Sequence, residues 1–250
     1  MNKYILFSSL ILSSSMCFSV CASSFESTQE KLVIEEASSQ KSSVSHENLQ
    51  QAVQTDNKVK QSLKAKLSQL SFFSAQFTQK VMMESGEILQ ESKGKLALQK
   101  PNSLYWETFE PDELYIISQN DEVWFYNPWI DEASVYSVST ATAKTPLLLL
   151  TSNDESLWDL YHVTKQATED ASKTRYVISS QDIDSQVKSL TLTFTSTDLG
   201  EVLSTFAFLD ATGQVSLITL SQFDGIKPPP ASLFKFEAPD GISVNDYRQQ

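Results

Sequence analysis

Side chains that could carry catalytic chemistry are few in this chain of 250 residues, and they are scattered. Its two histidines, His46 and His162, have no evident serine partner, and no Gly-x-Ser-x-Gly motif is present. The six glycines form no phosphate-binding loop. Asp182 and Asp184 are better explained as solvated turn carboxylates than as a general acid–base pair. We therefore predict no catalytic residue and no enzymatic activity, with a lipid esterase as the enzyme class left open.

Metal-binding chemistry is equally sparse. Both cysteines, Cys17 and Cys21, lie within the first 22 residues, so a zinc site elsewhere would need mostly carboxylate ligands, and no compact spacing suggests one. The adjacent pair Met82-Met83 fits a strand or turn better than a soft-metal site. We predict no metal and no cofactor.

The chemistry that the sequence does favour is apolar. Thr145–Thr151 contains four consecutive leucines, with proline at a good first helical position. A short helix of this kind is apolar on all sides and needs cover everywhere. It could be a fixed plug for the open end of a barrel, or a lid whose contacts can part.

Lys100 ends an apolar row of alternating residues that includes Leu96 and Leu98. If the register continues beyond Pro101, Leu104 and Trp106 follow on the same face. A lysine there either extends its ammonium to solvent or binds unpaired carbonyls at a helix C-terminus. The second alternative would make it a latch.

The elements that must position these residues are mostly strands. One amphipathic helix is predicted from about residue 57 to 70, since Val59, Leu63, Leu67 and Leu70 recur at helical spacing. A short helical turn is expected to end at Trp158. The predicted strands, separated by Pro, Asn and Gly turns, are Phe73–Met83, Lys95–Gln99, Leu104–Trp106, Leu114–Ser118, Val123–Tyr126, Ala133–Val138, Tyr161–Lys165, Arg175–Ser179, Val187–Thr195, Val202–Leu209 and Val215–Gln222. We predict a mainly β (α+β) fold, an antiparallel sheet curled into a barrel or half-barrel.

The N-terminal segment reads as a secretory signal. A short basic start precedes an apolar, Ser-rich stretch, and cleavage is expected between Ala22 and Ser23. An uncleaved anchor helix and lipidation of Cys21 are the alternatives. Residues 23–56 have the composition of a flexible or partly helical leader, which leaves 57–250 as one domain.

The formal net charge of −12 argues against nucleic acid as a partner and against an anionic bilayer surface. With a signal sequence and no later apolar stretch long enough to span a membrane, a monomeric periplasmic protein is predicted.

Several segments, in this order, resemble the periplasmic outer-membrane lipoprotein carrier (LolA) family. They are Phe73-Ser-Ala-Gln-Phe-Thr-Gln-Lys80, Gly94-Lys-Leu-Ala-Leu-Gln-Lys-Pro-Asn-Ser-Leu-Tyr-Trp106, Val123-Trp-Phe-Tyr-Asn-Pro128, Thr145-Pro-Leu-Leu-Leu-Leu150 and Phe234-Lys-Phe-Glu-Ala-Pro-Asp-Gly-Ile-Ser-Val-Asn-Asp246. The resemblance runs from about residue 57 to 248. The family usually has arginine where this chain has Lys100, and an aromatic residue where it has Leu104.

The resemblance implies an unclosed antiparallel barrel with an apolar cavity and a helical lid. It implies triacylated lipoproteins as cargo, received from an inner-membrane ABC transporter and passed to an outer-membrane acceptor. On this basis the acyl-chain cavity is assigned to Phe77, Leu96, Leu98, Leu104, Trp106, Trp124, Tyr126 and Phe206. The lid is assigned to Leu63, Leu67, Pro146, Leu147, Leu148 and Leu149, with Lys100 as its latch. The alternatives are an outer-membrane-anchored acceptor of similar fold and a periplasmic sensor domain that shares it.

Overall fold

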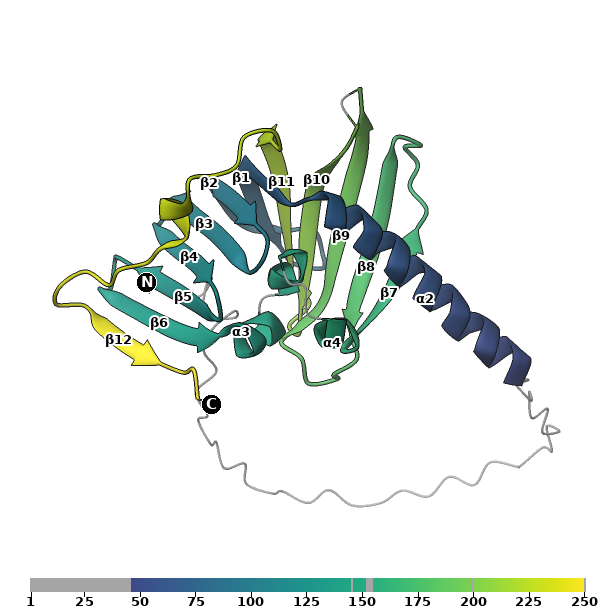
Figure 1. Ribbon diagram of the computed structural model, residues 1–250, viewed down its shortest axis with the longest axis horizontal. Coiled ribbons are helices and arrows are strands. Elements are labelled where there is room, and N and C mark those ends of the chain that lie inside the picture. The colour runs from purple at the N-terminus through teal and green to yellow at the C-terminus, as the bar shows by residue number, and fades with distance from the viewer. Residues whose placement is uncertain (1–45, 145, 152–154, 199, 250) are drawn as a thin grey trace, which may run out of the picture.

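The computed structural model describes residues 46–144, 146–151, 155–198 and 200–249 (Figure 1). The predicted cleavage site at Ala22 and Ser23 and most of the leader lie outside these residues. Within them, no helix combines the length and the apolar character needed to cross a bilayer.

A single sheet of twelve strands forms the body of the protein. Its order is β12-β6-β5-β4-β3-β2-β1-β11-β10-β9-β8-β7, and neighbours are antiparallel except for the parallel pair β12 and β6. The strands are β1 (Phe72–Met82), β2 (Ile88–Gln99), β3 (Ser103–Glu110), β4 (Leu114–Gln119), β5 (Glu122–Asn127), β6 (Glu132–Ser137), β7 (Tyr161–Gln166), β8 (Lys173–Ser180), β9 (Val187–Thr197), β10 (Gly200–Asp210), β11 (Val215–Asp224) and β12 (Ser243–Asp246).

The sheet is curled but not closed. β12 and β7 are its two edges and do not pair with each other, which confirms the predicted unclosed barrel. In Figure 1 the sheet curls around α3 and α4, while α2 runs along the β7–β9 side and extends beyond it. A sheet curled in this way has an inner face, which can enclose apolar groups, and an outer face.

Alternating apolar residues explain which side chains reach the inner face. In β3, Leu104, Trp106 and Thr108 are buried while their neighbours are partly exposed. Leu104 is opposite Leu98, and Trp106 is opposite Leu96, so the register predicted across Pro101 is confirmed. Because residues opposite each other in a sheet share a face, one apolar row crosses both strands.

In the part of the chain that the structure describes, five helical segments accompany the sheet: α2 (His46–Gln69), α3 (Val138–Lys144), η1 (Pro146–Leu150), α4 (Glu155–Trp158) and η2 (Ala231–Phe234). α2 begins at His46, inside the segment expected to be the leader, so the boundary predicted at residue 57 falls within a helix. α3 was not predicted, because its first residue was read as the end of a strand. The missed signal is Ser137, whose hydroxyl accepts the Thr140 N–H at 3.3 Å in the manner of a helix N-cap.

Candidate functional site

The inner face of the sheet is lined by large apolar side chains from both halves of the curl. Phe77 of β1 packs against Trp106 with ring centroids 4.1 Å apart, and Trp106 meets the edge of Phe206 from β10 at 6.2 Å. Of the residues assigned to the cavity from the sequence, six lie here and are buried: Phe77, Leu96, Leu98, Leu104, Trp106 and Phe206. The two walls of the curl therefore meet around one apolar interior.

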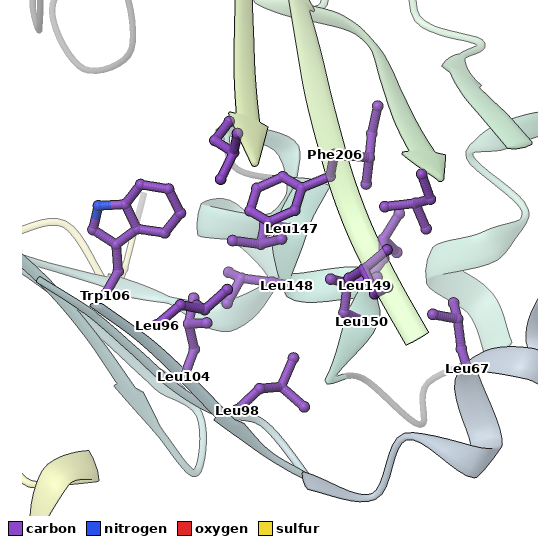
Figure 2. Close-up of a cluster of buried hydrophobic side chains, with 14 of the residues drawn as sticks. Leu67, Leu96, Leu98, Leu104, Trp106, Leu147, Leu148, Leu149, Leu150 and Phe206 are labelled. Carbon is purple, nitrogen blue, oxygen red and sulfur yellow. The ribbon is translucent and has the colours of Figure 1, made fainter. Parts of the chain in front are cut away.

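That interior is filled by the leucines of η1. Leu147, Leu148, Leu149 and Leu150, which we call the lid leucines, are each at most 2% exposed. Figure 2 shows them between Leu96, Leu104 and Trp106 on one side and Phe206 on the other. Pro146 begins the helix, as predicted, although its side chain is outside the described ones. The interior is thus closed by a helix rather than by strand side chains alone.

α2 supplies the second part of the cover. Its residues Leu63 and Leu67 are 0% and 3% exposed and belong to the same apolar cluster as the lid leucines. The two elements are far apart in sequence and reach the cluster from different sides, as the positions of Leu67 and Leu148 in Figure 2 show. A ligand entering the interior would have to displace one of them or both.

A glycine allows Phe77 to lie flat against the sheet. Phe77 is directly opposite Gly94 in the pairing of β1 with β2. A Cβ at Gly94 would lie 2.0 Å from the Glu107 carbonyl oxygen and 2.3 Å from the Phe77 ring, distances that no side chain tolerates. A glycine inside a strand often marks such a close approach. Gly94 is therefore part of the site's construction, although the sequence analysis did not single it out.

Two residues assigned to the cavity are on the wrong face. Trp124 and Tyr126 alternate with Val123 and Phe125 along β5, and it is the latter two that join the buried cluster. Trp124 and Tyr126 instead pack against Phe236 of the C-terminal segment, with centroids 5.0 and 5.4 Å apart. That segment runs over the outer face, where Trp124 lines a groove of about 420 Å³.

The physical reason is that β5 is apolar on both faces and so is not amphipathic. Both faces of β5 carry large apolar residues, because the C-terminal segment covers the outer face as the lid covers the inner one. Aromatic density therefore did not distinguish the faces. Further members of the buried cluster were not assigned to the cavity from the sequence. In addition to Val123 and Phe125, they include Phe73, Ile116, Tyr176, Leu190, Leu192 and Phe194.

Polar contacts attach α2 to the β7–β10 half of the sheet. Lys60 donates to the Trp158 carbonyl at the end of α4 at 3.0 Å. The hydroxyls of Ser62 and Tyr176 are 3.1 Å apart. Lys66 pairs with Glu201 of β10. These contacts set which half of the sheet carries α2.

Lys100 connects the other half of the sheet to the same helix. Its Nζ donates to the Leu67 carbonyl at 2.7 Å, and its backbone N–H donates to the Ser71 carbonyl at 2.9 Å. Leu67 is in the last turn of α2, where carbonyls lack the usual partner four residues on, and its carbonyl also accepts the Leu70 N–H at 3.1 Å. Partial burial lowers the pKa of Lys100 below its ordinary value, because desolvation disfavours the ammonium. This is the geometry that the latch hypothesis requires.

The turn that carries Lys100 also holds η1. The Asn102 N–H donates to the Thr151 carbonyl at 3.2 Å, and the Thr151 hydroxyl donates back to the Leu148 carbonyl at 2.9 Å. Ser118 secures the turn from β4, since its hydroxyl donates to the Asn102 carbonyl at 2.6 Å. The β2–β3 turn, residues 100–102, therefore contacts both parts of the cover at once.

The described residues around this interior are apolar rather than suited to metal binding. Among the described residues no three His, Cys, Asp or Glu side chains lie close enough to hold a metal ion. One ionisable group within the cluster is Tyr161, and burial raises its pKa. What the arrangement offers is apolar surface that is covered by separable helices.

The sequence is similar to a family model and to named relatives over most of its length. Residues 68–237 match the model "Outer membrane lipoprotein carrier protein LolA". A protein named outer-membrane lipoprotein carrier protein from Aeromonas salmonicida (strain A449) is 34% identical over 187 residues, which covers 75% of this chain and 88% of the relative. A protein of the same name from Yersinia enterocolitica serotype O:8 / biotype 1B (strain NCTC 13174 / 8081) is 33% identical over 187 residues, covering 75% and 87%.

Solved structures of low sequence identity also align with this chain. A LolA superfamily protein from Nitrosomonas europaea aligns with a TM-score of 0.41 and 11% identity, over 71% of this chain and 98% of the other. A putative outer membrane lipoprotein-sorting protein domain from Vibrio parahaemolyticus aligns with a TM-score of 0.43 and 11% identity, over 72% and 97%.

Proposed function

This chain belongs to the outer membrane lipoprotein carrier (LolA) family, and from that premise we propose that it is a periplasmic carrier of lipoproteins. It would bind the acyl chains of its cargo in the interior that the lid leucines fill, and move the cargo from the inner to the outer membrane. The observation that carries the proposal is the burial of Leu147, Leu148, Leu149 and Leu150 between the two walls of the curl.

The energetic need for such a carrier follows from the hydrophobic effect. An acyl chain of about 15 methylenes costs roughly 12 kcal/mol when exposed to water, at about 0.8 kcal/mol per methylene. That cost corresponds to roughly eight to nine powers of ten in concentration, so free diffusion across an aqueous space is negligible. A soluble protein with an apolar interior removes most of this cost.

The lid leucines provide a reason why binding stays reversible. Burying four leucine side chains is worth on the order of 6 to 12 kcal/mol, which is comparable to burying one acyl chain. Ligand therefore exchanges one set of apolar contacts for another, and the net affinity is the difference between them. Transfer then needs no energy source within this chain, and we propose no catalytic role for any residue.

The remaining parts of the proposal follow the family. Triacylated lipoproteins are the proposed cargo, an inner-membrane ABC transporter the donor and an outer-membrane protein the acceptor. Residues 1–22 would direct secretion and be removed between Ala22 and Ser23. Residues 57–250, working as a monomer, would form the carrier domain.

Analysis of the protein as isolated from the periplasm tests the proposal. We expect native mass spectrometry and lipid extraction to find triacylated lipoprotein or its acyl chains bound at up to one per chain. The purified carrier should also take lipoprotein from proteoliposomes that contain the transporter and ATP. A carrier that comes out of cells empty and stays empty in that assay would refute the proposal.

A second candidate is an acceptor of similar fold anchored in the outer membrane, since Cys21 lies at the end of the signal. It requires a lipidated Cys21 as the mature N-terminus. The mass of the mature chain decides between the two, because the carrier begins at Ser23 without lipid.

A further inference from the structure

The two rims of the curled sheet differ in what they expose. One rim, here called the odd rim, carries the β1–β2, β3–β4, β5–β6, β8–β9 and β10–β11 connections together with the starts of β7 and β12. The opposite rim carries the β2–β3 turn with its lid contacts and the end of β11. Of the ten large hydrophobic side chains that are exposed in the described part of the chain, nine lie at the odd rim: Met83, Ile88, Phe109, Trp129, Ile130, Leu160, Ile183, Leu209 and Val244. Only Ile226 lies at the other rim.

The most exposed aromatic side chain of this set is at the β5–β6 connection. Trp129 is 72% exposed and Ile130 beside it is 57% exposed. The β3–β4 connection lies at the same rim, two strand positions away and thus about 10 Å distant. Phe109 is near the end of β3, and Pro111 begins the connection. A tryptophan exposed to this extent leaves apolar surface in water, and such residues are typical of a surface that becomes covered by a partner.

The stretch of chain that carries these residues is acidic. The neighbouring strand β2 contributes two cations, Lys93 and Lys95, which pair with Glu110 and Glu107. Residues 101–143, which span β3 to β6, contain eight aspartates and glutamates and no lysine or arginine. Asp112 and Glu113 in the β3–β4 connection and Asp131 in the β5–β6 connection are exposed. Arg248, which follows the end of β12 at the opposite rim, pairs with Glu122 and Asp246. An apolar tip framed by carboxylates repels anionic lipid and attracts a cationic protein surface.

We infer that Trp129 and Ile130, together with the carboxylates at Asp112, Glu113 and Asp131, form a docking surface for a protein partner that surrounds an apolar pocket with basic side chains. The inference rests on the proposed function, since the partners it concerns are the two membrane proteins that exchange cargo with the carrier. Trp129 and Ile130, the apolar tip of this surface, insert into the pocket of the partner. The carboxylates speed the association of the two proteins and set their relative orientation. The docking surface and the β2–β3 turn lie on opposite rims. Docking therefore does not cover Lys100, and cargo can still displace the lid.

The test measures binding of the full mature chain to the detergent-solubilised transporter and to the outer-membrane acceptor by biolayer interferometry. The variants are the double substitution Trp129→Ala/Ile130→Ser and the charge reversal Asp112→Lys/Asp131→Lys. The matched control is Ile226→Ser, which removes an exposed isoleucine (88% exposed) from the opposite rim. Binding of a dansyl-labelled fatty acid monitors the interior in every variant.

We expect the tip variant to weaken binding to at least one partner about tenfold or more, as loss of a central aromatic does at other interfaces. The charge reversal should slow association and remove its dependence on salt. The Ile226→Ser control should bind like the wild type, and all variants should bind the fatty acid normally.

Unchanged binding of the tip variant to both partners would overturn the inference while leaving the carrier function intact. Wild-type binding to phosphatidylethanolamine/phosphatidylglycerol vesicles that is lost with Trp129 would also overturn it, in favour of a membrane surface. Failure of the wild type to take up fatty acid or lipoprotein would instead refute the proposed function itself.

Discussion

At the scale of single residues, Lys100 differs from the usual pattern of the family, which has arginine at this position. A lysine presents a point charge with three donors, whereas an arginine presents a planar fork. Here the single ammonium reaches one carbonyl, that of Leu67, and the neighbouring Asn102 N–H reaches Thr151. The backbone of the turn thus makes the second contact that a forked side chain could have made.

Replacing Lys100 by methionine tests the latch while keeping the apolar stem. We expect Lys100→Met to lose the bond to the Leu67 carbonyl and to destabilise the closed lid by about 1 kcal/mol. Ligand then displaces a weaker lid, so a dansyl-labelled fatty acid should bind roughly fivefold more tightly and transfer to the acceptor more slowly. Lys100→Arg is the control and should behave like the wild type. Equal affinities for all three proteins would leave Lys100 as a surface residue without a latch role.

At the scale of elements, the cover is divided between two helical segments with different attachments. α2 is tied to the β7–β10 half through Lys60, Ser62 and Lys66. η1 is connected to α3, and α3 continues from β6 on the other half. The β2–β3 turn contacts both. Opening the interior therefore requires the turn to release at least one of them, and η1 has fewer polar ties to the sheet among the described residues.

A leucine truncation in η1 distinguishes a displaceable lid from a fixed plug. Leu148→Ala should lower the free energy of unfolding by about 2–5 kcal/mol, because Leu148 is 1% exposed. If ligand must displace the lid, the same change should tighten fatty-acid binding, since less is lost on opening. Denaturant unfolding and ligand titration measure the two effects.

Leu192 of β9 provides the matched control for that experiment. It is also fully buried, but it belongs to a wall rather than to the lid. Leu192→Ala should cost similar stability without raising the affinity. Should both truncations weaken binding alike, η1 would be a plug and not a lid.

At the scale of the whole molecule, one continuous sheet serves two purposes. Its inner face encloses the apolar interior, and the part of its outer face around β4 and β5 is covered by the C-terminal segment through Phe234 and Phe236. Polar side chains that end up between these layers become part of the core. Burial accordingly raises the pKa of Tyr105, Tyr115, Tyr136 and Tyr161.

These tyrosines predict how stability depends on alkaline pH. In the unfolded chain tyrosine loses its proton near pH 10, whereas the folded protein holds these protons to higher pH. The folded state then binds more protons than the unfolded state, so stability falls as pH rises above about 10. Lys100, whose pKa is lowered, acts in the opposite direction but is a single group. The melting temperature should be nearly constant from about pH 7 to 9 and decrease above about pH 10.

The variant Tyr161→Phe tests whether buried tyrosines cause the decrease in melting temperature at alkaline pH. This variant removes one buried phenol, so its decline above pH 10 should be shallower than that of the wild type. A spectrophotometric titration should show fewer tyrosines that resist ionisation until unfolding. If the variant and the wild type show the same dependence of melting temperature on alkaline pH, Tyr161 does not cause the decrease.

Much of the fold was predictable from local pattern. The alternation of apolar and polar residues predicted that Leu96, Leu98, Leu104 and Trp106 lie on one face of the sheet. The antiparallel pairing of β2 with β3 confirms this prediction. Proline and consecutive leucines identified η1 as a short apolar helix. These features depend on neighbours in sequence, where steric preference and periodicity act directly.

What the sequence by itself determined is the class of fold, the apolar character of the lid and the position of a lysine that ends an apolar row. Only the tertiary structure decided that Trp124 and Tyr126 face outward, because a strand with apolar residues on both sides has no intrinsic inner face until other segments cover it. It likewise decided that Lys100 meets the Leu67 carbonyl rather than solvent, since the end of α2 comes to the β2–β3 turn only when the sheet curls. Contacts between distant parts of a chain depend on how whole layers pack, and no local pattern encodes that.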